Sequence, residues 1–125
     1  MEAVKEETAG AGSLKQITVI RIGGYMEFCT ADELDKVLAV LLQKQSYNII
    51  VDLAAVDYIS SRGWSIFLSK IKEIRENDGD IKLTNMNGNV YEVYKVLEFF
   101  WFLRVYDSMP EAVRDFDLGV PPMPE

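Results

Sequence analysis

The sequence predicts an α/β fold with a mixed, mainly parallel sheet of four to five strands and about four helices. Short β-branched segments alternate along the chain with amphipathic segments of helical period, a pattern typical of parallel sheets. Ile49, Ile50 and Val51 form a continuous apolar run, as in strands covered on both faces. The length of 125 residues suits one domain.

The chain first predicts one strand and one helix. Residues 17–22 (ITVIRI) predict the strand, and Gly23-Gly24 predicts the turn that ends it. Thr30 and Glu33 have the spacing of a capping box, with Thr30 as the helix cap. The apolar residues that follow lie on one helical face: Leu34, Val37, Leu38, Leu41 and Leu42.

The middle of the chain repeats this order. Residues 48–53 predict a second strand, and the segment 60–63 (SSRG) precedes a second helix. A turn at 77–80 leads to a third strand at 81–84. The apolar face expected on the second helix consists of Trp64, Phe67, Leu68, Ile71 and Ile74.

The last third predicts two more helices around a short strand. Residues 87–89 open a helix, residues 103–106 form the strand, and Ser108 caps the final helix. The apolar residues expected on these two helices are Val90, Val93, Leu97, Val113 and Phe116. We expect a mobile leader at 1–13, with a further edge strand near 3–5, a domain at 14–116 and a flexible proline-rich tail at 117–125.

Composition argues against several classes of function. The net charge of −7 disfavours nucleic acid and anionic membranes as partners. Histidine is absent and Cys29 is the sole cysteine, so a zinc site and a Cys-His nucleophile are not expected. No cofactor or metal is expected. A lone cysteine, no signal peptide and no membrane-length apolar run predict a cytoplasmic protein. A monomer or weak dimer is expected.

Three features have a structural and a functional interpretation. Asp52 and Asp57 flank the expected end of a strand, where an aspartate-dependent enzyme could use them; the structural interpretation is caps and turns. Cys29 is expected to be a small buried side chain, although a helix start could activate it. Residues 99–102 (FFWF) are expected to be chiefly core, with an exposed docking or self-association patch as the alternative.

The pair Ser60-Ser61 lies at the expected start of the second helix. A serine there is most simply a helix cap. Its hydroxyl is also accessible, and a phosphate on it would meet the unpaired amides of the helix end. The site therefore suits phosphorylation by another enzyme.

Three segments of the chain follow a known pattern. Residues 24–34 (GYMEFCTADEL) match GELDxxTAPEL, residues 51–64 (VDLAAVDYISSRGW) match LDLSxVxFIDSSGL, and residues 105–113 (VYDSMPEAV) match IYDSLEEAL. These motifs occur in the same order in anti-sigma factor antagonists, which are STAS domains. The chain resembles this family from about Gln16 to Phe116.

The resemblance implies helices packed mainly on one face of the sheet and a serine phosphorylated by a partner. That serine aligns with Ser61; Ser60 is the less favoured acceptor. The implied partners are an anti-sigma factor that is a GHKL-type serine kinase and a PP2C-like phosphatase. The unphosphorylated chain would bind the anti-sigma factor, and phosphorylation would release it. The residues expected at the partner surface are Glu27, Phe28, Tyr58, Ser60, Ser61, Arg62, Gly63 and Trp64.

The chain departs from the family pattern around the expected acceptor serine and before the last strand. Ser60 stands where the family has Asp, Arg62 where it has a small residue, and Trp64 where it has Leu. Phe100-Trp101 replaces a threonine-glycine bend before the last strand. The alternative function is therefore a constitutive adaptor or scaffold subunit of the same fold that is not phosphorylated. The aspartate-dependent enzyme is the third.

Overall fold

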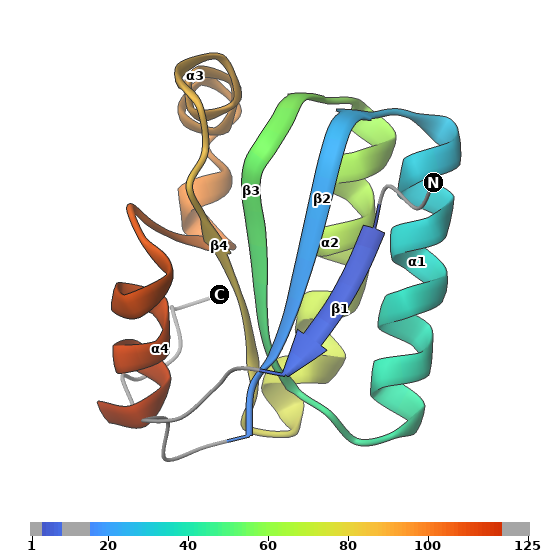
Figure 1. Cartoon of the computed structure of the whole chain (residues 1–125), viewed down its shortest axis with the longest axis vertical. Helices are drawn as coiled ribbons and strands as arrows, with labels where there is room; N and C mark the ends of the chain where they lie inside the picture. The colour runs from blue at the N-terminus through green and yellow to red at the C-terminus, as the bar shows by residue number, and fades with distance from the viewer. Residues whose placement is uncertain (1–3, 9–15, 119–125) are drawn as a thin grey trace.

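The computed structural model describes residues 4–8 and 16–118, which form five strands, four α-helices and one short 3-10 helix (Figure 1). Their bounds are β1 Val4–Thr8, β2 Thr18–Met26, α1 Phe28–Gln43, β3 Asn48–Ile59, α2 Ser61–Glu76, β4 Asp80–Thr84, α3 Gly88–Val96, η1 Phe99–Trp101, β5 Arg104–Tyr106 and α4 Met109–Leu118. The predicted α/β class and the order of its elements are confirmed.

The five strands form one sheet in the order β1-β2-β3-β4-β5. β1 pairs antiparallel with β2, and it is the edge strand expected near residues 3–5. The other neighbours are all parallel. The carboxyl ends of β2, β3 and β4 therefore lie at one edge of the sheet, which is also where α1, α2 and α3 begin (Figure 1).

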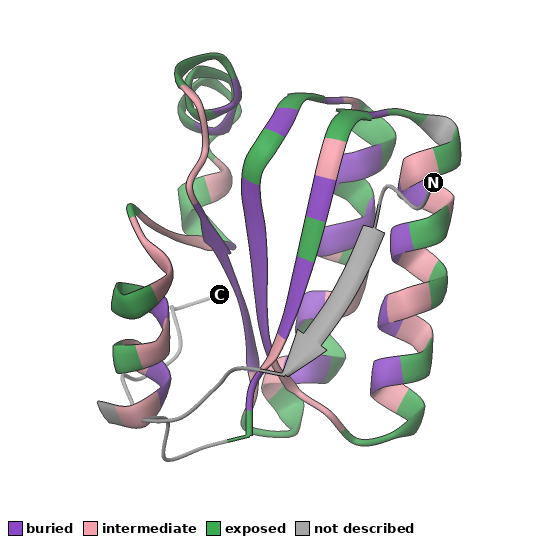
Figure 2. Ribbon diagram, viewed as in Figure 1, coloured by how far each residue is buried: buried purple, intermediate pink, exposed green. Residues whose placement is uncertain are grey.

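Helices cover both faces of the sheet unequally. α1 and α2 pack on one face and α4 packs on the other (Figure 1). Alternate residues of β3 serve the two layers: Ile49 and Val51 join the large core with α1 and α2, whereas Ile50 joins Ala112 and Phe116 of α4. β3 and β4 are buried along most of their length (Figure 2).

The predicted inner faces of α1 and α2 are confirmed. On α1, Leu34, Leu38 and Leu41 are buried, and Val37 and Leu42 pack against the core as partly buried side chains. Each side chain so buried stabilises the fold by roughly 1.5–3 kcal/mol. The face of α2 is equally apolar, with Trp64, Phe67, Ile71 and Ile74 buried and Leu68 partly buried.

The turn predicted at Gly23-Gly24 is wrong, because β2 runs through both glycines to Met26. The pairing with β3 shifts register between Arg21 and Gly23 and again between Gly24 and Tyr25. Gly24 has a φ of 77°, a conformation that residues with a Cβ rarely adopt. The glycines therefore permit irregular pairing inside a strand and do not end it.

The second strand is also longer than predicted. β3 continues from Asn48 to Ile59, so Asp52 lies inside the strand and does not flank its end. The Asp52 carboxylate forms an ion pair with Arg21 and accepts hydrogen bonds from the Ala54 amide (3.0 Å) and Asn85 Nδ2 (3.2 Å). These contacts tie β3 to β2 and to the residue that directly follows β4.

The capping box predicted at Thr30 is wrong. α1 begins at Phe28 with Glu27 as its N-cap, and no side chain caps this end. Because β2 extends to Met26, the chain enters the helix directly, and the Ala31 amide donates to the Glu27 carbonyl (2.8 Å). Thr30 therefore lies within the first turn, where it cannot act as the cap.

The third helix and the segment after it bury fewer residues than predicted. On α3, Val90 and Tyr94 are buried, whereas Val93 and Leu97 are exposed. The prediction that residues 99–102 are chiefly core is wrong. Phe99 is partly buried against the core, but Phe100, Trp101 and Phe102 are 37%, 56% and 46% exposed.

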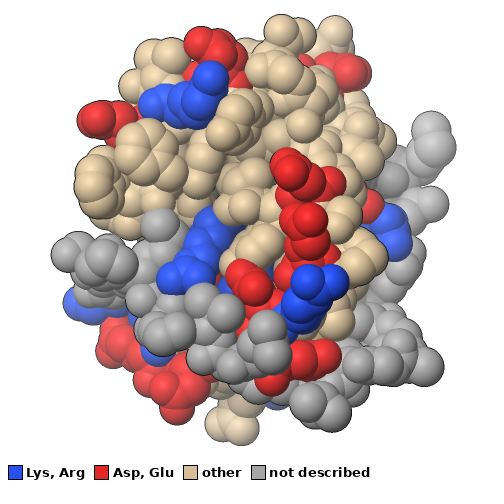
Figure 3. Space-filling model, turned by 90° about the vertical axis from the view of Figure 1, so that its left-hand side faces the viewer, with Lys and Arg blue, Asp and Glu red and all other residues tan. Residues whose placement is uncertain are grey.

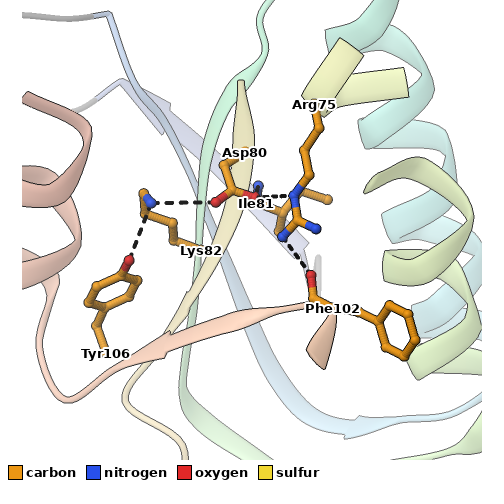
Figure 4. A network of polar contacts seen from close by, with 6 residues as sticks. All are labelled: Arg75, Asp80, Ile81, Lys82, Phe102 and Tyr106. Atoms are coloured by element: carbon orange, nitrogen blue, oxygen red, sulfur yellow. Dashed lines mark hydrogen bonds and ion pairs between the residues drawn. The ribbon is translucent and has the colours of Figure 1, made fainter. Parts of the chain in front are cut away.

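A buried polar network connects α2, β4 and β5 (Figure 4). Asp80 accepts from Arg75 Nε at 3.2 Å and lies 3.4 Å from Lys82 Nζ. Arg75 also donates to the Phe102 carbonyl, and Lys82 donates to the Tyr106 hydroxyl at 3.2 Å. Burial lowers the pKa of Lys82, and the Asp80 carboxylate opposes this shift. The network fixes the end of η1 to the sheet.

The final helix begins as predicted, since the Glu111 amide donates to Ser108 Oγ at 3.4 Å. Ala112 and Phe116 are buried, and α4 extends to Leu118, two residues past the expected domain end. In the described part of the chain, no helix has the length and apolar character needed to cross a membrane.

Candidate functional site

The candidate site lies where β3 ends and α2 begins. Ser60 is the N-cap of α2: its Oγ accepts from the Gly63 amide (3.2 Å), and its carbonyl accepts from the Trp64 amide (3.1 Å). The Ser60 amide donates to the Met26 carbonyl at 2.9 Å, which joins this point to the end of β2. The Ser60 side chain is thus committed to holding the helix start.

Ser61 is the first residue of α2 and is exposed. The first amides of a helix have no acceptor one turn earlier, and they form the positive end of the helix dipole. The Ser60 hydroxyl serves one of them, the Gly63 amide. The Ser61 hydroxyl therefore sits beside a positive helix end, with Arg62 next to it in the sequence.

Gly63 allows α2 to approach the sheet closely. A Cβ at this position would lie 2.8 Å from Ile59 Cγ2 and 3.0 Å from Met26 Cε, closer than normal contacts permit. Gly63 is buried. It therefore lies beneath the surface expected to bind the partner and is not part of that surface.

Two tyrosines lie side by side at the exposed end of the sheet. Tyr25 and Tyr58 are paired across β2 and β3, with ring centroids 6.5 Å apart in an edge-to-face arrangement. They are 61% and 48% exposed. Glu27 is exposed at the start of α1, and Phe28 follows it as the first helical residue. Of the residues expected at the partner surface, Glu27, Tyr58, Ser61 and Arg62 are exposed.

Trp64 is 2% exposed and lies beneath this surface. Its ring stacks on Phe99 at 4.7 Å and lies 6.4 Å from the rings of Phe67 and Tyr94. Among the described residues, its buried indole N–H has no hydrogen-bond partner. Trp64 therefore joins α2 to α3 and η1 and does not offer a surface contact.

A pocket of about 90 Å³ opens beside Trp64. Ile59 and Trp64 contribute to it from the sheet and α2, and α3 contributes Val90 and Val93. The complete lining is Asp57, Tyr58, Ile59, Trp64, Asn89, Val90 and Val93. The pocket is mainly apolar and shares Tyr58 with the tyrosine pair.

The buried hydroxyl of Tyr94 should make the stability of the fold depend on pH in the alkaline range. Its hydroxyl donates to the Leu103 carbonyl at 2.7 Å, and burial, with a smaller effect of Tyr91, raises its pKa to about 12. The unfolded chain loses this proton near pH 10, so the free energy of unfolding should fall as pH rises from about 10 to 12. Tyr94→Phe should show a smaller fall in urea unfolding measured across this range. A fall as steep as that of the wild type and of the exposed control Tyr58→Phe would contradict the assignment.

Of the other polar candidates, Asp57 lines the pocket beside Trp64, whereas Asp52 does not reach this site. Asp52 is engaged inside β3, as described above, and Asp57 is exposed further along the same strand. Cys29 is exposed in the first turn of α1, so the prediction that it is buried is wrong. Within residues 4–8 and 16–118, no three acidic or cysteine side chains come together in a way that could hold a metal ion.

The sequence interpretation missed Tyr25, Met26 and Val93. Met26 and Tyr25 lie beyond the two glycines that were expected to end the strand, so their pairing with β3 was hidden. Val93 has helical spacing from Val90 and is therefore expected in the core, yet it is 36% exposed and lines the pocket. The contact between Tyr25 and Tyr58 can be predicted only if both β2 and β3 are extended past the ends expected from the sequence.

Comparison with known proteins identifies relatives over most of the chain. Residues 8–112 match the family model described as STAS domain. BtrV of Bordetella bronchiseptica, whose name marks it as a candidate anti-sigma factor antagonist, is 29% identical over 98 residues, covering 78% of this chain and 84% of BtrV.

Solved structures share the same fold. The unphosphorylated form of the anti-sigma factor antagonist SpoIIAA has a TM-score of 0.67 and 18% identity, covering 93% of this chain and all of that one. The phosphorylated form of SpoIIAA from Bacillus has a TM-score of 0.65 at 14% identity, with 90% and 99% covered. A sulfate transporter family protein from Wolinella succinogenes has a TM-score of 0.71 at 21% identity, with 83% and 87% covered. At these identities the likeness concerns the fold alone.

Proposed function

The chain belongs to the STAS domain family, and on that premise we propose that it is an anti-sigma factor antagonist switched by phosphorylation of Ser61. In its unphosphorylated form it binds an anti-sigma factor of GHKL kinase type, and phosphorylation releases that partner. A PP2C-like phosphatase resets the switch. The proposal rests on one observation above all: Ser61 is an exposed hydroxyl at the first position of α2, while Ser60 already serves as the cap.

A phosphate on Ser61 would be compatible with the fold. It adds close to two negative charges, which the positive end of α2 stabilises without movement of the backbone. Ser61 is exposed, so no packed side chain has to move. Ser60 is a poor acceptor by comparison, because its Oγ is occupied by the Gly63 amide.

The proposed partner surface consists of the exposed residues around Ser61. Tyr25 and Tyr58 provide apolar contact area, and Glu27 and Arg62 provide charges at its edge. A partner packed against an uncharged hydroxyl would have to accommodate a desolvated dianion after phosphorylation. This cost opposes binding. Gly63 and Trp64 support the surface from beneath.

The phosphorylation site can be located directly. The purified chain is incubated with ATP and each GHKL-type serine kinase encoded in the same genome, and any phosphate is placed by mass spectrometry. We expect a single phosphate on Ser61, none on Ser61→Ala, and continued phosphorylation of Ser60→Ala. The last variant loses a helix cap and hence ~1 kcal/mol of stability. Undiminished phosphorylation of Ser61→Ala would overturn the proposal.

A constitutive STAS adaptor is the second candidate. The likeness to a sulfate transporter family protein favours it, because a domain of this fold also occurs in that class of protein. The departures at Ser60, Arg62 and Trp64 favour it too. If no kinase modifies Ser61, the same surface would serve a permanent complex.

A further inference from the structure

The pocket beside Trp64 has no role in the proposed switch as described so far. Three elements form it: β3 contributes Ile59, α2 contributes Trp64, and α3 contributes Val90 and Val93. Ile59, Trp64 and Val90 are buried, whereas Val93 is 36% exposed. The pocket therefore has an apolar interior, and its α3 side can be reached from outside.

The volume of the pocket suits a single side chain. About 90 Å³ is available in it. Small-molecule and cofactor sites usually have ~300–1,000 Å³, so this pocket is too small for a ligand of that kind. An apolar cavity of ~150 Å³ can hold one benzene molecule. By that measure the pocket accommodates about four carbon or sulfur atoms, the size of a leucine, isoleucine or methionine side chain.

Trp64 carries an unpaired donor beside the pocket. Among the residues that the structure describes, its indole nitrogen is the sole buried side-chain N or O atom without a hydrogen-bond partner. Most buried donors in native proteins are paired. An unpaired donor in a residue that lines an open pocket suggests a site that another molecule completes.

The surroundings of the pocket are mainly apolar with one charge. Figure 3 shows mostly uncharged side chains at the end of the molecule that carries α3. Asp57 is the sole charged residue of the described lining and is exposed. No cation pairs with its carboxylate within the described part of the chain. An unpaired carboxylate on a chain of net charge −7 favours a cation on the partner.

The pocket is continuous with the surface proposed to bind the anti-sigma factor. Tyr58 belongs to both, because its ring lies 6.5 Å from that of Tyr25 and it also lines the pocket. Trp64 follows Ser61 by one turn of α2. A partner bound over Ser61 and the two tyrosines therefore has the pocket within reach.

We propose that this pocket anchors one aliphatic side chain of the anti-sigma factor, of leucine, isoleucine or methionine size, beside a basic residue that pairs with Asp57. The inference rests on the proposed function, since it takes the partner surface around Ser61 as its starting point. Burial of the aliphatic side chain adds affinity. The charge pair orients the partner and speeds its association.

Isothermal titration with the GHKL-type kinase that phosphorylates Ser61 tests the anchor in the complex. Val93→Phe places a larger side chain at the pocket and should weaken binding by ~10-fold or more. Val96→Phe is the matched control, because Val96 is also an exposed valine of α3 (69%) but does not line the pocket. It should bind as the wild type does. Wild-type affinity of Val93→Phe, or an equal loss in both variants, would overturn the anchor.

The charge pair is tested by the same titration at two salt concentrations. Asp57→Asn should weaken binding several-fold at low salt and reduce its dependence on salt. Asp78→Asn is the control, since Asp78 is exposed in the turn after α2, and it should change neither quantity. An Asp57→Asn variant with the affinity and salt dependence of the wild type would overturn the pairing with a basic residue.

The pocket can also be probed without the partner. The chain has two tryptophans, Trp64 beside the pocket and Trp101, which is 56% exposed on η1. Their indole N–H signals are separate in a heteronuclear NMR spectrum. N-acetyl-leucinamide at millimolar concentration should shift the Trp64 signal and leave that of Trp101 unchanged, whereas N-acetyl-alaninamide should shift neither. Val93→Phe should abolish the response.

These measurements distinguish failure of the anchor from failure of the switch. A Trp64 signal that responds to neither probe, or equally to both, would overturn the anchor even if phosphorylation of Ser61 controls binding. If no GHKL-type kinase binds the chain, the proposed function fails, and the anti-sigma factor is excluded as the occupant whatever the NMR result.

Discussion

Replacing Ser61 by aspartate is expected to weaken binding of the anti-sigma factor by ~10²-fold or more while leaving thermal stability nearly unchanged. Ser61 is exposed at the positive end of α2, so a carboxylate is tolerated in the free protein. In the complex the same charge must be desolvated against a surface that fits a hydroxyl. A penalty of several kcal/mol corresponds to this loss of affinity.

Isothermal titration of the anti-sigma factor with Ser61→Asp, Ser61→Ala and Ser65→Asp tests this expectation. Ser65 is also exposed and lies one turn further along α2, so Ser65→Asp controls for the added charge and should cost only a few-fold. Ser61→Ala should bind as the wild type does. Equal affinity of Ser61→Asp and wild type would remove the basis of the switch.

Asp80→Asn is expected to destabilise the fold by about 3–5 kcal/mol. The carboxylate lies between Arg75 and Lys82, whose side chains are only 6% and 3% exposed. Asparagine preserves the shape and the acceptor for the Ile81 amide, but it leaves two buried cations without their anion. Guanidinium unfolding measures the loss, and Asp78→Asn in the exposed turn nearby is the matched control.

The deficit of Asp80→Asn should shrink as pH rises. Burial lowers the pKa of Lys82 below its ordinary value of 10.5, and loss of the carboxylate removes the opposing effect. Between the lowered pKa and 10.5 the unfolded chain binds more protons than the folded one, so folding is favoured by raising the pH. A stability within ~1 kcal/mol of wild type at neutral pH would show that the network matters little.

The order of the elements was predictable because it depends on periodic burial. The faces of α1 and α2 and the continuous apolar run of β3 are visible in the sequence, since water is excluded from the same side at every turn. The resemblance to the family pattern showed which positions of this chain correspond to which positions of the family motifs. The position of Ser61 at the start of α2 also follows from local sequence, because Ser60 and Gly63 have cap spacing.

The details that failed depend on tertiary contacts. Gly23 and Gly24 look like a turn, yet both pair with β3, opposite Ala55 and Val56, and this pairing favours a continued strand. The N-cap of α1 is then Glu27 and not Thr30. Residues 99–102 are as apolar as a core segment. Of the four, only Phe99 packs against the core, where its ring stacks on Trp64. Composition cannot show which of four aromatic side chains will be buried.

Whether phosphorylation of Ser61 controls partner binding is decided by the affinity of one protein preparation before and after phosphorylation. The chain is phosphorylated by its kinase, the modification is confirmed on Ser61 by mass spectrometry, and both forms are titrated with the anti-sigma factor. We expect ~10²-fold weaker binding of the phosphorylated form, an almost unchanged melting temperature, and recovery after phosphatase treatment. Equal binding of the two forms would contradict it.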